Sequence, residues 1–110
     1  MNIDSLRRYE SADDFFALNG SVVMKMTVAA AISVCEQAIS HGLVVSRVEG
    51  GIWHNPGFEA RLDCIWDGAD SSVDKVSVEK SNRFAAIFIK SESFQHDTFI
   101  IAVSKVLFGE

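Results

Sequence analysis

The chain has 110 residues, the size of one ordinary domain and too short for two independent hydrophobic cores. Hydrophobic residues make up 48% and charged residues 23%, a mixture typical of a folded globular protein and not of a disordered one. The net charge of −5 disfavours contact with phosphate backbones, so we expect no nucleic-acid partner.

The start of the chain and its most apolar stretch predict a cytoplasmic protein without a membrane partner. Asp4 precedes any apolar run, which is not the order of a signal peptide. The apolar residues 22–35 are interrupted by Lys25 and followed by Glu36. Too few uncharged residues remain to cross a hydrocarbon layer of about 30 Å.

Two helices are predicted before residue 43. Ser11 is a suitable N-cap for a short helix over Ala12–Leu18, because its hydroxyl can accept from the first free backbone N–H groups. A longer helix is predicted over residues 21–41, where a narrow polar stripe leaves most of the surface apolar and therefore buried. Gly42 fits the left-handed position that ends a helix, and we expect His41 to cap that end and not to act in catalysis.

A β-hairpin is predicted next, from strands over residues 43–48 and 58–66 joined by the turn residues 55–57. The pair Gly50-Gly51 predicts a bulge or bend before Trp53. Strict alternation along the second strand predicts one set of side chains toward the core, Phe58, Ala60, Leu62, Cys64 and Trp66, and the other toward solvent, Glu59, Arg61, Asp63, Ile65 and Asp67.

The last elements are a helix and a strand. Apolar residues recur every three or four positions over residues 73–91, which predicts a helix, although residues 76–78 could instead form a short strand. Residues 98–107 predict a central strand, because both of its faces are apolar. The result is a single α+β domain in the order helix, helix, strand, strand, helix, strand, with a small, mostly antiparallel sheet packed against the long buried helix.

No motif in the sequence indicates a catalytic centre, a metal site or a cofactor. There is no HExxH pair and no glycine-rich phosphate loop, so we expect no metal, no cofactor and no catalytic residue. Cys35 and Cys64 are predicted to be small core residues, with a disulfide or a reactive thiol as the alternative. A nucleophilic Cys64 would need His54 as its base and Asp63 or Asp97 as the orienting acid, but alternation separates Cys64 from Asp63.

Acidic residues are concentrated in one segment. Between residues 59 and 74 five acids accompany a single base, Arg61. Three of the acids share one strand face by alternation, and the whole set could form one negative surface with Trp53 and Ile65 as its apolar centre. The acids are Glu59, Asp63, Asp67, Asp70 and Asp74. Such a surface would attract the basic groups of a partner, whereas the alternative is a solvated sheet face with helix-capping acids.

Two segments of the chain resemble a known family. GGIWHNPGFEARLDCIWDG and NRFAAIFIKSESFQHDTFIIAVS are similar to segments of the small immunity proteins of bacterial contact-dependent growth inhibition systems. The resemblance implies a cytosolic protein that binds the C-terminal toxic domain of a cognate toxin, often a nuclease, and blocks it without catalysis. It carries over no contact residues, because such pairs use different surfaces.

A second function stays open from the residues alone. The chain could be a small enzyme or a ligand-binding module with a pocket near Cys64 and His54. Such a protein requires a deep pocket with converging polar groups.

Overall fold

The computed structural model of the chain describes residues 2–68 and 74–106. Its elements are β1 (Arg8–Tyr9), α1 (Ala12–Leu18), β2 (Lys25–Thr27), α2 (Val28–Gln37), the 3-10 helix η1 (Ala38–His41), β3 (Leu43–Trp53), β4 (Phe58–Asp67), α3 (Lys75–Glu92) and β5 (Thr98–Lys105). The predicted α+β class and the order of the larger elements are confirmed. The short strands β1 and β2 were not predicted.

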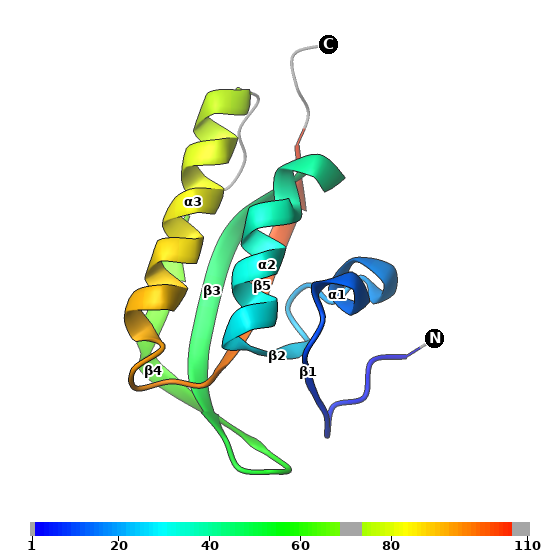
Figure 1. Cartoon of the computed structure of the whole chain (residues 1–110), viewed down its shortest axis with the longest axis vertical. Coiled ribbons are helices and arrows are strands. Elements are labelled where there is room, and N and C mark those ends of the chain that lie inside the picture. The colour runs from blue at the N-terminus through cyan, green and yellow to red at the C-terminus, as the bar shows by residue number, and fades with distance from the viewer. Residues whose placement is uncertain (1, 69–73, 107–110) are drawn as a thin grey trace.

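The strands form one five-stranded sheet in the order β1-β2-β5-β3-β4. Only the first pair is parallel; the other neighbours are antiparallel. The helices α2 and α3 lie side by side against one face of the sheet (Figure 1). The last strand is central, as predicted, and its side chains Phe99 and Ile101 are fully buried in the core.

The predicted helix over residues 21–41 is wrong in its first third. Residues Lys25–Thr27 form β2, and α2 begins only after Thr27, whose hydroxyl accepts a hydrogen bond from the Ala30 N–H at 3.2 Å. Met24 and Met26 are both fully buried. Their spacing of two residues suits a strand. So few apolar residues directly before a helix do not distinguish the two-residue period of a strand from the 3.6-residue period of a helix.

Replacing Thr27 with alanine should lower the free energy of unfolding by about 1 kcal/mol, because the first turn of α2 loses its side-chain acceptor. Urea denaturation followed by circular dichroism measures this change. Thr27→Ser keeps the hydroxyl and should retain most of the stability. Equal stabilities of the alanine variant and the unmodified protein would show that the cap contributes nothing.

The end of the η1 segment follows the prediction. Gly42 has a φ of 70°, and its N–H donates to the carbonyls of Ala38 and Ile39. The His41 ring stacks on Phe16, with ring centroids 3.7 Å apart and planes 3° apart. His41 therefore ties α1 to the end of η1, a structural contact that sequence alone did not predict.

Helix α3 is tied to β3 by a buried side chain. The Asn82 Oδ1 accepts from the Val45 N–H at 2.7 Å, and its Nδ2 donates to the Leu43 carbonyl at 3.2 Å. The β3–β5 register shifts just after Val45, so the amide serves backbone groups at an irregularity of the ladder. The strand considered for residues 76–78 is wrong, because they belong to α3. Within the described ranges, every helix falls short of the length and apolarity that a bilayer crossing requires.

The β3–β4 pairing contains a large irregularity. Glu49 lies opposite Ile65 and Gly51 lies opposite Ala60, so Gly50 alone faces four residues of β4. We call residues 61–64 the β4 insertion. The predicted alternation is therefore wrong in the middle of this strand, and Leu62, expected in the core, is 89% exposed.

The β4 insertion changes which face the strand presents. A Cβ on Gly50 would clash with Cys64 Sγ and lie 2.7 Å from the buried ring of Phe99, which places Cys64 on the helix-covered face. A Cβ on Gly51 would lie 2.8 Å from the Phe58 ring, on the opposite face. Phe58 was predicted to share a face with Cys64, and the insertion separates the two.

Candidate functional site

The predicted acidic surface lies on the β3–β4 hairpin and on the outer strand of the sheet. Strand β4 has a neighbour on one side only, so its other edge faces outward. Six of the seven predicted surface residues are described, whereas Asp70 lies outside the described residues. The structure gives the six rather different surroundings.

Arg47 neutralises part of the charge near the end of β4. Its Nη1 lies 2.7 Å from Asp67 Oδ1, and its Nε lies 2.9 Å from Glu49 Oε2. These hydrogen bonds, that of Glu49 first, raise the pKa of the Arg47 side chain above its usual value. Asp67 is well exposed, but part of its charge is matched by this arginine.

Glu59 is similarly matched at the hairpin. Its two carboxylate oxygens lie 2.8 Å from His54 Nε2 and 2.9 Å from Arg61 Nε. The hydrogen bond from His54 and the charge of Arg61 lower the pKa of Glu59. Glu59 thus stays ionised at neutral pH, and its carboxylate is engaged by His54 and Arg61.

Asp63 carries the least compensated charge of the surface. It is exposed and lies in the β4 insertion beside the projecting side chain of Leu62. Among the ion pairs of residues 2–68 and 74–106, Asp63 takes part in none. An exposed leucine next to an unmatched carboxylate combines an apolar contact with a long-range charge.

Asp74 is the N-cap of α3. Its carboxylate accepts from the backbone N–H of Val76 at 3.3 Å and of Ser77 at 3.2 Å. The Ser77 hydroxyl, which donates to the same carboxylate at 2.6 Å, is the main cause of its lowered pKa. The capping role weighed for this acid is confirmed.

The acids do not share one face, which corrects the prediction. Ile65 and Asp67 lie opposite Glu49 and Arg47, on the face away from the helices. Glu59 precedes the β4 insertion and lies opposite Ile52, so the changed alternation places its side chain on the opposite face from Asp67. Trp53 has the same phase as Glu49 in β3 and is half-buried. Trp53 and Ile65 therefore share the uncovered face of the sheet.

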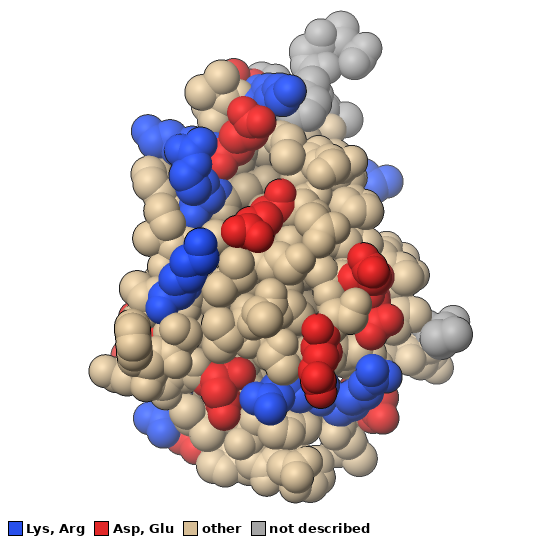
Figure 2. Space-filling model, viewed as in Figure 1, with Lys and Arg blue, Asp and Glu red and all other residues tan. Residues whose placement is uncertain are grey.

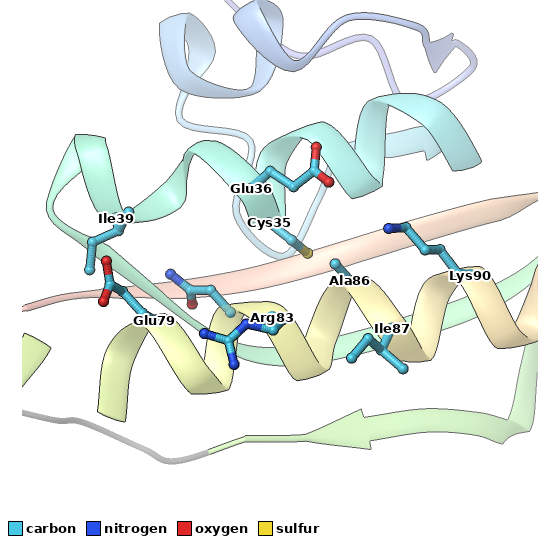
Figure 3. A pocket seen from close by; sticks show the side chains of 9 residues that line it. Cys35, Glu36, Ile39, Glu79, Arg83, Ala86, Ile87 and Lys90 are labelled. Carbon is cyan, nitrogen blue, oxygen red and sulfur yellow. The ribbon is translucent and has the colours of Figure 1, made fainter. Parts of the chain in front are cut away.

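The helix-covered side of the molecule carries both signs of charge. Figure 2 shows basic side chains gathered along α3 and acidic side chains over the neighbouring part of that side. A groove of about 370 Å³ runs between α2 and α3 (Figure 3). Its lining residues are Cys35, Glu36, Ile39, Glu79, Asn82, Arg83, Ala86, Ile87 and Lys90.

The thiol in this groove is buried and has a raised pKa. Cys35 is buried, and its sulfur points from α2 toward Ala86 of α3 (Figure 3). Burial, followed by the nearby charge of Glu36, raises the pKa of Cys35 to about 12. Both cysteines are free and buried, as predicted for core residues.

The arrangement considered for a nucleophilic Cys64 does not form. His54 is bonded to Glu59, and Asp97 accepts from the Trp53 N–H at 2.9 Å. Cys64 is fully buried, and burial, followed by the charge of Glu92, raises its pKa to about 12. A protonated, buried thiol without the predicted base is a poor nucleophile.

Comparisons with known proteins point to the immunity proteins that the sequence resembles. A family described as Colicin-E5 Imm protein matches residues 24–104. Immunity protein CdiI of Burkholderia pseudomallei is 61% identical over 106 residues, covering 96% of this chain and 97% of that protein. The Colicin-E5 immunity protein of Escherichia coli is 35% identical over 69 residues, covering 63% of this chain and 83% of that protein. The predicted resemblance to immunity proteins is confirmed.

Proposed function

This chain belongs to the colicin-E5 immunity protein family, and we propose that it is an immunity protein that binds a cognate toxin domain and blocks it without catalysing a reaction. The observation that supports this most strongly is the high identity to a named immunity protein over nearly the whole chain. Cys64 lies apart from His54, which bonds to Glu59, and burial raises the pKa of both thiols to about 12, so neither thiol is a ready nucleophile.

We propose further that the toxin is a nuclease whose basic substrate-binding surface meets this acidic chain. A nuclease holds its substrate through lysine and arginine side chains. A protein of net charge −5 is attracted to such a surface and competes with the nucleic acid for it. The immunity protein then acts by occupying the substrate site or its rim.

The docking surface that we propose keeps the predicted residues but follows the outer edge of β4, because the acids lie on both faces of the sheet, and it is centred on the β4 insertion. Asp63 has no matched cation among the described ion pairs, and Leu62 beside it is 89% exposed. Trp53 and Ile65 add partly exposed apolar area on the uncovered face of the sheet. Glu59 and Asp67, whose charges are partly matched, and Asp74, which caps α3, complete the surface together with Asp70, which lies outside the described residues.

Charge reversal at Asp63 tests the surface. With a cognate toxin domain, Asp63→Lys should slow association about tenfold at low ionic strength and weaken its dependence on salt. Glu79→Lys makes the same change of net charge on α3 and serves as the matched control. Stopped-flow fluorescence measures both rates, and equal slowing by the two variants would remove the β4 insertion from the proposed surface.

Growth of cells that produce the toxin domain tests the function itself. Co-production of this chain should restore growth and yield a one-to-one complex. Asp63→Lys should weaken protection only when the immunity protein is scarce, because slower association is compensated by higher concentration. Absence of both protection and complex would refute the immunity function, whatever the surface.

A further inference from the structure

Three side chains from separate segments meet at the C-terminal end of α3, on the helix-covered side of the β4 insertion. They are Cys64 of β4, Glu92 at the end of α3, and His96 in the connection to β5. The Cys64 sulfur, a Glu92 carboxylate oxygen and a His96 ring nitrogen all lie within 4.8 Å of one another. The His96 N–H donates to the Glu92 carbonyl at 2.9 Å, which fixes these two residues relative to each other.

One member of this cluster has an unsatisfied polar atom. The His96 side chain is 5% exposed, and its Nδ1 has no hydrogen-bond partner among the described residues. The same nitrogen lies 3.2 Å from Glu92 Oε1. A buried ring nitrogen that lacks a hydrogen bond costs free energy unless something else binds it.

The spacing fits the ligand shell of a small metal ion. Two ligands about 2.0–2.1 Å from a tetrahedral zinc ion are separated by about 3.3 Å, which is close to the Nδ1–Oε1 distance of 3.2 Å. The Glu92 carboxylate is only partly buried, so its movement can close the remaining distance to the fully buried sulfur of Cys64. Thiolate, imidazole and carboxylate together are a donor set that zinc accepts.

We propose that Cys64, Glu92 and His96 form a zinc site, with water as the fourth ligand. The Glu92 side chain is 31% exposed, so solvent reaches the cluster from its side. Zinc replaces the thiol proton and binds the sulfur as thiolate. The ion connects β4, the end of α3 and the entry to β5, and so fixes the base of the β4 insertion.

The charges of the donor set also suit a dication. A thiolate and a carboxylate whose ligand atoms lie within 4.8 Å of each other repel, and a divalent ion between them removes that repulsion.

Titration of the full, untagged and reduced chain with Zn²⁺ alone tests the site, after removal of bound metal with a chelator. One equivalent should bind, and the Tm should rise by about 5–10 °C when free Zn²⁺ exceeds the Kd tenfold. Co²⁺ should give the intense visible bands of a tetrahedral ion and a thiolate-to-cobalt charge-transfer band.

Two ligand variants and two controls separate this site from a surface carboxylate. Glu92→Gln, at a partly exposed position, should weaken Zn²⁺ binding at least about tenfold, since even groups outside the ligand shell are worth that much. Cys64→Ala should abolish the charge-transfer band. Cys35→Ala and His54→Asn change another buried thiol and another histidine–glutamate pair, and should leave both readouts unchanged.

Unaltered Zn²⁺ affinity in Glu92→Gln, or a Co²⁺ spectrum without the charge-transfer band, would overturn the zinc site. Circular dichroism of each metal-free variant verifies that it is folded. Because Glu92→Gln keeps the size of the side chain, its result decides the question even if Cys64→Ala does not fold. The immunity function is measured separately by growth protection, so either proposal can fail alone.

Discussion

Replacing Asn82 with alanine should lower the free energy of unfolding by about 2–4 kcal/mol. The amide accepts from the Val45 N–H and donates to the Leu43 carbonyl in a buried position. Alanine leaves both backbone groups without their partner, and each unsatisfied buried group costs about 1–3 kcal/mol. The change also removes the polar link between α3 and β3.

Urea denaturation at pH 7 measures this loss, with Ser81→Ala as the matched control. Ser81 precedes Asn82, is also buried, and donates to the Val45 carbonyl at the long distance of 3.4 Å. Its truncation should therefore cost less than about 1 kcal/mol. Similar losses in the two variants would contradict the role assigned to the Asn82 amide.

Gly50→Ala should destabilise the protein by about 3 kcal/mol, at the upper end of what overpacking costs. The new methyl group would clash with Cys64 Sγ and lie 2.7 Å from Phe99 Cε2. Both neighbours are fully buried, so neither can move into solvent. Thermal and urea unfolding of the variant measure the loss.

A double-mutant cycle assigns the cause. In the combination of Gly50→Ala with Cys64→Ala the sulfur is absent, and the second methyl fills part of the space that it leaves. The double variant should be more stable than the sum of the single changes predicts, by about 1 kcal/mol or more. Strict additivity would mean that Cys64 does not restrict residue 50.

The elements with a long pattern of apolar residues could be predicted from the sequence. The short strands, which depend on pairing with strands distant in the sequence, could not. The periodicity of residues 73–91 predicted α3, and the apolar run from residue 98 predicted a central strand. The strand Lys25–Thr27 has three residues and is completed only by its neighbours β1 and β5. Nothing local distinguishes it from the first turn of a helix.

The arrangement of the candidate site also depends on strand pairing that the sequence does not reveal. Gly50-Gly51 correctly predicted an irregularity, but the sequence could not indicate that four residues of β4 would fall opposite one residue of β3. That register moves Leu62 into solvent and places Glu59 and Asp67 on different faces. The meeting of Cys64 with His96 also depends on the register, since 31 positions separate them in the sequence.

The β4 insertion has a further consequence for the outermost strand. An uninterrupted outer strand offers a continuous row of backbone donors and acceptors to any other extended chain, including a second copy of the same protein. Here the β4 insertion, four residues opposite one, breaks that row near its middle, and Arg61 and Asp63 place charges at the break. The interrupted edge and its charges therefore disfavour edge-to-edge pairing of two copies along β4.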